Sequence, residues 1–183
     1  MTDWRWFRPL IDSLRCAGLG WLRRIALMKI QTKRLELVLL TREAVLERVA
    51  RLTTAERSQI SPDWLEQVKA TDDENVWVHG FEAYAIGTKS LVAQCGFKGP
   101  PQGDGVVELA YGVEPEHQGN GFATEVAEAL SQFALGCDNV STVRAHTLPE
   151  SNASTRVLTK CGFRKTGEVI DPEDGLVWRW ELP

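Results

Sequence analysis

The six residues Gln118-Gly119-Asn120-Gly121-Phe122-Ala123 stand between an apolar stretch, Val106–Val113, and an amphipathic stretch, residues 121–135. The first stretch predicts a strand, and the apolar spacing of three and four in the second predicts a helix. Two glycines at a strand-to-helix turn let the backbone approach a ligand closely. The unpaired N–H groups at a helix start attract anions. This stretch therefore predicts an anion-binding turn suited to a pyrophosphate.

Two common nucleotide-binding motifs do not fit this turn. A dinucleotide fold would have Gly or Ala at Thr124 and an acidic residue at the end of the next strand, where His146 and Thr147 stand. A P-loop would need GxxxxGK[ST], and Gly87-Thr88-Lys89-Ser90 lacks the Gly-Lys step. Neither motif therefore accounts for the turn.

The bulk composition predicts a single globular domain that does not bind nucleic acid. Its 183 residues are 43% hydrophobic and 25% charged, which are ordinary globular values. The net charge of −4 lacks the basic excess of a nucleic-acid-binding protein. Residues 1–28 hold five arginines against two aspartates, giving +3, which leaves −7 for residues 29–183. That acidic body weakly favours an amine or other cationic substrate.

The first 28 residues differ from the rest and predict an N-terminal extension. Phe7, Leu10, Leu14, Trp21 and Ile25 form a helical apolar stripe with arginines beside it. A basic amphipathic helix on a membrane surface is one interpretation, and a disordered extension is the other, because Gly18 and Gly20 interrupt the helix. No apolar run is long enough to span a membrane. The four cysteines have no CxxC spacing, which indicates free thiols in a reducing, cytoplasmic compartment.

Hydrophobic periodicity predicts alternating strands and helices from residue 30 onward. Helices are expected at 42–52, after Ser61-Pro62, at 121–135 and at 152–160. Strands are expected at 35–40, 76–86, 91–97, 106–113, 142–147, 163–170 and 176–182. The strand, helix and strand between 106 and 147 predict a parallel pair with a right-handed crossover.

The turn and its neighbours resemble the GNAT (general-control-related N-acetyltransferase) superfamily. Its pyrophosphate motif, [Q/R]xxGx[G/A], is filled by Gln118, Gly121 and Ala123. The stretches 108–113, 145–154 and 160–163 resemble the strands and helix around it. The chain is most similar to the branch that contains the ribosomal-protein N-terminal acetyltransferases. This implies an α/β (α+β) domain at 29–183, with a mixed, mostly antiparallel sheet of six or seven strands, a splayed parallel pair, and helices on both faces.

The resemblance also implies acetyl-CoA as co-substrate, no metal, and an amine acceptor as partner. The pantetheine arm would pair with backbone at Gly112 and Val113, and Asn152 and Ser154 would lie beside it. The pyrophosphate would be held by the turn and the first residues of its helix: Gln118, Gly119, Asn120, Gly121, Phe122, Ala123 and Thr124. The acceptor would be a protein N-terminus or a small amine, and a homodimer is compatible with the family.

Glu108 and His146 are the candidate catalytic residues. Transfer requires a neutral amine, so a base or a water chain must remove a proton. Alternation places Glu108 on the face of its strand that carries Ala110 and Gly112, where a carboxylate without a functional role is not expected. His146 closes the next strand, and histidine titrates near neutrality. Glu108 is the first candidate for the general base, and an ordinary salt-bridged glutamate is the alternative.

One position departs from the family pattern. Many members carry a tyrosine that protonates the leaving CoA thiolate, and the matching residue here is Leu158. Water, Tyr111 or no acid at all remain open. The predicted function is therefore acyl-CoA-dependent N-acyl transfer, and the alternative is a non-catalytic acyl-CoA-binding or regulatory module of the same fold.

Overall fold

The computed structural model describes residues 28–58, 60–101, 103–172 and 174–183. Eight strands form one mixed sheet in the order β1-β2-β3-β4-β5-β6-β8-β7. All neighbouring pairs are antiparallel except β5 and β6. The strands are β1 (Lys29–Gln31), β2 (Leu35–Leu39), β3 (Phe81–Ala85), β4 (Leu91–Phe97), β5 (Val106–Val113), β6 (Thr142–Thr147), β7 (Arg164–Asp171) and β8 (Gly175–Leu182).

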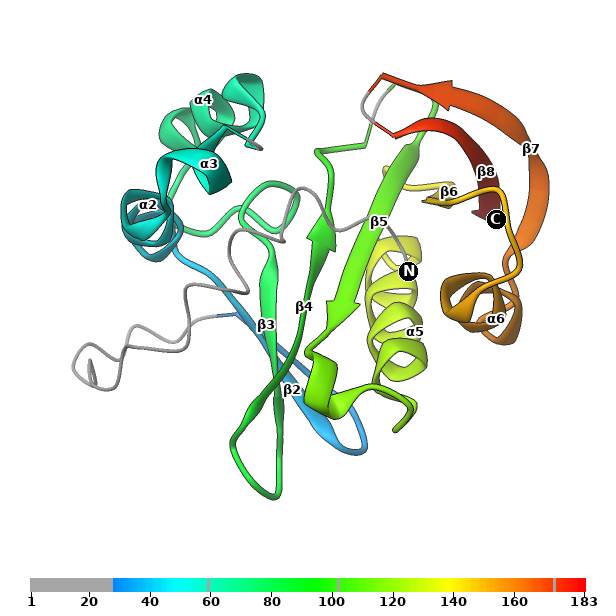
Figure 1. The fold of residues 1–183 in the computed structure, drawn as a ribbon, viewed down its shortest axis with the longest axis horizontal. Coiled ribbons are helices and arrows are strands. Elements are labelled where there is room, and N and C mark those ends of the chain that lie inside the picture. Colours follow the sequence, from blue (N-terminus) through cyan, green and yellow to red (C-terminus); the bar gives the residue numbers. More distant parts are fainter. Residues whose placement is uncertain (1–27, 59, 102, 173) are drawn as a thin grey trace.

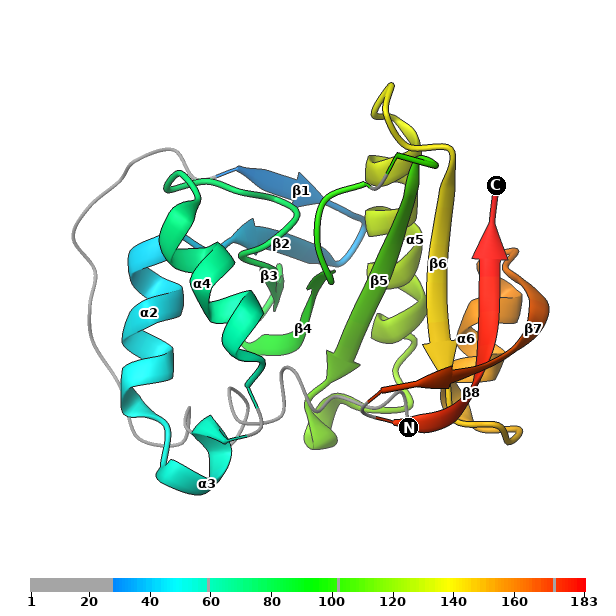
Figure 2. The same ribbon diagram turned by 90° about the horizontal axis from the view of Figure 1, so that it is seen from above.

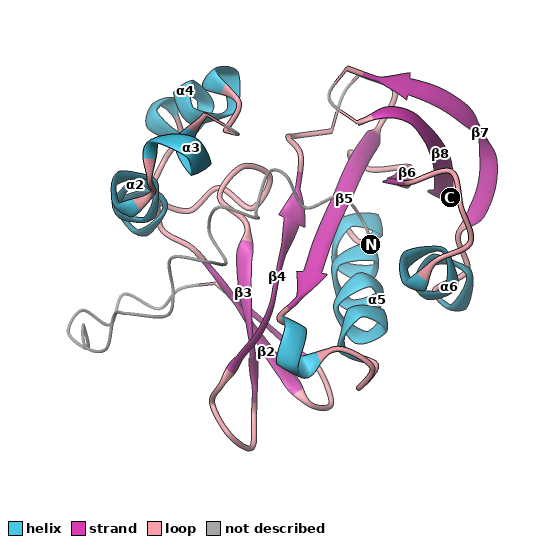
Figure 3. Cartoon of the chain, in the orientation of Figure 1, coloured by secondary structure: helices cyan, strands magenta, loops and turns pink. Residues whose placement is uncertain are grey.

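Helices cover both faces of the sheet (Figures 1 and 3). Helix α2 (Arg42–Arg51) is capped by Thr41, and helix α4 (Pro62–Ala70) is capped by Ser61. Between them lies the short α3 (Thr54–Arg57). A 3₁₀ turn, η2 (Pro115–His117), leads into α5 (Phe122–Leu135), and α6 (Ala153–Lys160) follows β6.

The predicted mixed sheet with one parallel pair is confirmed, but two details of the strand prediction are wrong. The sheet has eight strands rather than six or seven, because Lys29–Gln31 forms β1 on the edge of β2. The stretch 76–86 is a strand only over Phe81–Ala85, because Trp77 and Val78 form a turn whose backbone bonds to Asn75.

The core lies between α5 and one face of the sheet. Val126, Leu130 and Ala134 of α5 are fully buried there. On β4 and β5 the odd-numbered residues face this core, since Phe97 packs on Phe133 of α5 and Leu109 belongs to the same cluster. Alternation therefore turns the even-numbered residues of both strands to the other face, toward α2 and α4.

The two interpretations of residues 1–28, a membrane-surface helix or a disordered extension, lie outside the described residues except for Met28. In the part of the chain that the structure describes, no helix is long and apolar enough to cross a membrane.

Removal of the Leu130 side chain should destabilise the fold strongly. Leu130 is fully buried against the sheet, so Leu130→Ala should lower the free energy of unfolding by about 2–5 kcal/mol through lost burial and a cavity. Leu176→Ala is the matched control, because that leucine is 44% exposed. Urea denaturation of both variants measures the difference, and equal losses would contradict this account of the core.

Candidate active site

The centre of the site is the gap where β5 and β6 part. The two strands pair only at Val106, Val107 and Glu108, and both continue beyond. From there β5 pairs with β4 alone and β6 with β8 alone. Figure 2 shows the two strands diverging toward their C-terminal ends. The facing backbone edges are therefore available to a ligand, and the splayed parallel pair is confirmed.

The glycine turn is built to receive an anion. Gly119 and Gly121 have φ of +78° and +79°, a conformation that other residues adopt only at a cost. Gly121 is the N-cap of the 14-residue α5, and no side chain caps that helix. A Cβ on Gly119 would meet nothing within 4 Å. The N–H groups of the first helical turn thus face an open approach, which fits a pyrophosphate.

The polar side chains of the turn brace its shape. Gln118 donates from Nε2 to the Val113 carbonyl at 3.2 Å, which ties the turn to the end of β5. Asn120 donates from Nδ2 to the carbonyl of His117 at 3.1 Å and to that of Gln118 at 3.2 Å. These two predicted binding residues therefore support the turn through their side chains, and its backbone is left for the ligand.

Arg34, in the loop between β1 and β2, clamps this turn from outside. Its Nη1 donates to the Asn120 carbonyl at 2.9 Å, and its Nε pairs with Glu125 at 2.7 Å. Its guanidinium also lies 4.7 Å from the centre of the Phe122 ring. Burial raises the pKa of Glu125, but Thr32 and Arg34 outweigh this and lower it. Sequence analysis missed Arg34, since no local pattern links it to a turn so far along the chain.

The residues predicted to flank the cofactor arm adopt different roles. Asn152 caps α6 by accepting bonds at Oδ1 from the N–H groups of Ser154 and Thr155. Its Nδ2 is buried and has no partner among the described residues, so it remains a donor for a ligand. Ser154 is buried, and its side chain is near enough to the Tyr111 hydroxyl to lower the pKa of that group. Gly112 and Val113 end β5 beside the gap, as the resemblance implies.

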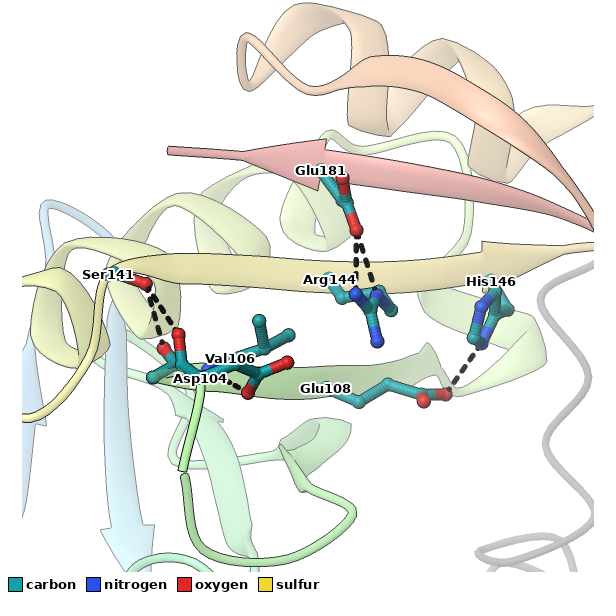
Figure 4. A network of polar contacts seen from close by, with 8 residues as sticks. Asp104, Val106, Glu108, Ser141, Arg144, His146 and Glu181 are labelled. Atoms are coloured by element: carbon teal, nitrogen blue, oxygen red, sulfur yellow. Dashed lines mark hydrogen bonds and ion pairs between the residues drawn. The ribbon is translucent and has the colours of Figure 1, made fainter. Parts of the chain in front are cut away.

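The two predicted catalytic residues meet where the strands begin to part. His146 Nδ1 lies 3.0 Å from Oε1 of Glu108, across the start of the gap (Figure 4). Lys98, which sequence analysis missed, places its Nζ 2.6 Å from the same oxygen. All three side chains are largely buried, with 14% of His146 and 23% of Glu108 exposed.

These contacts keep Glu108 ionised. Burial raises the pKa of Glu108, but the hydrogen bond from His146 and the charge of Lys98 outweigh it and lower the pKa to about 2. An anionic Glu108 requires a proton on His146 Nδ1 for the bond between them. The other ring nitrogen, Nε2, is then an acceptor in neutral imidazole. It is buried and has no partner among the described residues.

Lys98 supplies the positive charge that faces the carboxylate of Glu108. Burial lowers the pKa of Lys98, but Glu108, Asp171 and Asp174 outweigh it and raise the pKa, so Lys98 stays cationic.

On the neighbouring strands β6 and β8, Arg144 donates to Glu181 at 2.8 Å (Figure 4). Figure 4 also shows Ser141 and Asp104 tying the loop before β6 to the loop before β5. Within the described ranges, no group of three potential ligands is placed to hold a metal ion.

Two other candidates are accounted for by packing. Leu158, which the resemblance matched to a family tyrosine, is fully buried. Tyr111 is 3% exposed. Burial and Cys161 raise the pKa of its hydroxyl more than Ser154 lowers it. Tyr111 is therefore neutral and a weak acid.

A mixed sheet with one splayed parallel pair, and an uncapped glycine turn beside it, define the acyl-CoA acetyltransferase fold class. The chain belongs to the acetyltransferase (GNAT) family, whose domain model matches residues 24–164. It is 35% identical over 80 residues to the uncharacterized N-acetyltransferase YoaA of Bacillus subtilis (strain 168), covering 44% of this chain and 45% of that protein. It is 30% identical over 86 residues to the uncharacterized N-acetyltransferase p20 of Bacillus licheniformis, covering 47% and 48%. The chain thus spans about half the length of these curated relatives.

Solved structures share the whole fold at low sequence identity. A putative GNAT-family acetyltransferase from Bordetella pertussis superposes with a TM-score of 0.62 at 21% identity, covering 85% of this chain and 99% of that one. RimL, a ribosomal L7/L12 alpha-N-protein acetyltransferase in complex with coenzyme A, gives 0.62 at 15%, covering 85% and 97%. A spermidine N-acetyltransferase chimera from Vibrio cholerae and hSSAT gives 0.61 at 18%, covering 82% and 95%. These likenesses establish the fold.

The ionised Glu108 should contribute stability that depends on pH. Its pKa in the fold is about 2, against an ordinary 4.5, so its contribution is complete above pH 4.5 and is lost as the pH falls toward 2. The stability difference between wild type and Glu108→Gln should therefore shrink from pH 5 to pH 2.5. Thermal melts across this range measure it, with the exposed Glu66→Gln as control. A difference that stays constant with pH would contradict the ion pairing.

Proposed function

We propose that this protein transfers an acetyl group from acetyl-CoA to a primary amine. The observation that carries the proposal is the uncapped double-glycine turn at the start of α5, directly beside the parted edges of β5 and β6. The turn would receive the pyrophosphate of the co-substrate, and the parted strand edges would receive its extended pantetheine arm. Family membership supports the same conclusion.

The residues present fit acetyl-CoA. Backbone N–H groups of Phe122, Ala123 and Thr124 would hold the pyrophosphate, in a turn kept in shape by Gln118, Asn120 and Arg34. The free backbone edge at Gly112 and Val113 and the unpartnered Nδ2 of Asn152 would hold the pantetheine arm. When bound, the co-substrate supplies an activated thioester carbonyl.

Glu108 and His146 accept the amine proton as a pair. A carboxylate with a pKa of about 2 is a poor base on its own. It instead fixes the imidazole tautomer and stabilises the imidazolium that forms, while Nε2 of His146 takes the proton, directly or through water. This refines the hypothesis that Glu108 alone is the base. A free thiol has a pKa of about 8.5, so the thiolate can leave without a dedicated acid.

The acceptor is a primary amine of a protein N-terminus or of a small molecule. Relatives of the fold carry both names: RimL is a ribosomal-protein acetyltransferase, and the Vibrio cholerae chimera is a spermidine acetyltransferase. We also propose a cytoplasmic location, which the free thiols of Cys95, Cys137 and Cys161 support.

Gly121→Glu should abolish binding of CoA. The new side chain would force a residue with a φ of +79° to carry a Cβ, and it would place a negative charge at the phosphate site. Calorimetric titration with CoA measures the loss. Gly103→Glu is the control, since that exposed loop glycine has no neighbour within 4 Å. If Gly121→Glu binds CoA like wild type, the turn is not the cofactor site.

His146→Ala should lower kcat by roughly 10²–10⁴-fold, the usual contribution of a positioned base. Glu108→Gln should also lower kcat, because the imidazolium that forms on proton transfer loses its anionic partner. Both variants should bind CoA normally. A wild-type kcat for His146→Ala would return the role of base to Glu108. Tight CoA binding by the wild type without turnover on any amine would favour a non-catalytic module.

A further inference from the structure

The side-chain amide of Gln94 is buried and makes no hydrogen bond to the described residues. It lies in the middle of β4 and is 1% exposed, and neither its Nε2 nor its Oε1 has a partner among the described residues. A buried polar group left unpaired costs free energy, and native structures rarely contain one. A side chain that lacks both a donor partner and an acceptor partner indicates a ligand that supplies both.

On the β5 side of Gln94, the neighbouring strand residues on its face of the sheet are small. Its direct neighbour on β5 is Gly112, and next to these two on the same face are Gly96 and Ala110, which also pair with each other. This face is the one that carries Glu108, opposite the α5 core. The amide of Gln94 therefore rises from a floor of small residues, on the same side of the sheet as the proposed catalytic pair.

Arg48 adds a positive charge near Gln94 on the side of β3. Across β3, Gln94 is paired with Glu82, which binds Arg48 of α2 and accepts a bond from the Tyr84 hydroxyl at 2.6 Å. Directly opposed residues have Cβ atoms about 4.5–5.5 Å apart. The Nη1 of Arg48 is buried and has no described partner. The unpaired set is thus two donors, Arg48 Nη1 and Gln94 Nε2, and one acceptor, Gln94 Oε1.

This set matches a peptide bond better than a polyamine. A peptide unit offers a carbonyl to the two donors and an N–H to the acceptor. A polyamine offers only cationic donors, and Arg48 would repel them. Gly112 lies four residues from Glu108 along β5, about 13 Å at 3.2–3.4 Å per residue, which is the length of three to four extended residues.

We infer that Gln94, with Arg48, binds a peptide bond of the acceptor three or four residues from its reacting amine. The inference rests on the proposed acetyl transfer to a primary amine. The acceptor would then be a peptide N-terminus whose chain runs from the gap along β5, over Ala110 and Gly112. Gln94 sets specificity and takes no part in the proton transfer.

The test compares acceptors of increasing length. Alanine amide, its di-, tri- and tetrapeptide homologues and spermidine are assayed with acetyl-CoA. In the wild type, kcat/KM should rise between the dipeptide and the tetrapeptide amide. Gln94→Leu should lower kcat/KM for the tetrapeptide by about tenfold to a hundredfold, the worth of one or two hydrogen bonds, and should leave alanine amide and CoA affinity unchanged. Gln132→Leu, on the exposed side of α5, is the matched control.

A methylated peptide separates recognition from a general defect. N-methylation of the third or fourth peptide bond of a pentapeptide amide should reduce kcat/KM in the wild type at one of these positions and should have little effect in Gln94→Leu. Since Leu replaces an unpaired amide by an apolar group of similar size, the variant should melt at or above the wild-type temperature. An equal loss for all acceptors, or weaker CoA binding, would place Gln94 against the cofactor arm and overturn the inference.

The outcome for the proposed function is read independently. If the wild type acetylates none of these amines, the proposed function fails. Calorimetric binding of the tetrapeptide amide to the CoA-loaded protein then still tests Gln94. Binding by the wild type that Gln94→Leu loses would support the inference, and equal binding or no binding would overturn it.

Discussion

The parting of β5 and β6 beyond Glu108 and Arg144 is the constraint on which the rest of the site depends. A sheet normally closes such a gap, because unpaired backbone groups are costly. Here each strand pairs with its other neighbour instead, β5 with β4 and β6 with β8. Helix α5 packs beneath both strands, with Val126 and Leu130 in the shared core. The gap is therefore fixed before any ligand arrives, and the glycine turn and the proposed catalytic pair, Glu108 and His146, take their positions from it.

The charged side chains around the gap are paired with side chains of opposite charge or with hydrogen-bond partners. One oxygen of Glu108 contacts both Lys98 and His146, and Arg144 donates to the carboxylate of Glu181. Removing one member of such a buried pair is costly, because the other charge is left unpaired. This pairing holds the imidazole in one orientation, and its Nε2 has no partner among the described residues. If His146 accepts the amine proton as proposed, no rearrangement is needed at the moment of proton transfer.

Much of the fold could be predicted because its signals are local. Thr41, Ser61 and Asn152 cap helices where the sequence predicts them. The same kind of signal, Thr53 followed three residues later by Glu56, marked α3 and was overlooked. β1 has only three residues, too few for a periodic pattern, and its pairing with β2 is a tertiary event.

The site was predicted less completely, because its contacts join distant segments. Alternation placed Glu108 on the correct face, but it could not show that His146 lies 3.0 Å away. Lys98 and Arg34 reach their partners from a loop and a turn, where no periodicity operates. The family resemblance pointed to the whole turn, Gln118 and Asn120 included, and only the structure distinguishes side chains that brace the turn from backbone that faces the ligand.

The short overlap between β5 and β6 also divides the sheet mechanically. Three residue pairs, with α5 beneath, join the half that ends in β5 to the half formed by β6, β8 and β7. A ligand bonded to both free edges would act as a missing strand and make the two halves one cooperative unit. Part of its binding free energy would then resist local unfolding of strands it never contacts. Amide hydrogens of β7 and β8, at the far edge of the sheet, would exchange more slowly when the gap is filled.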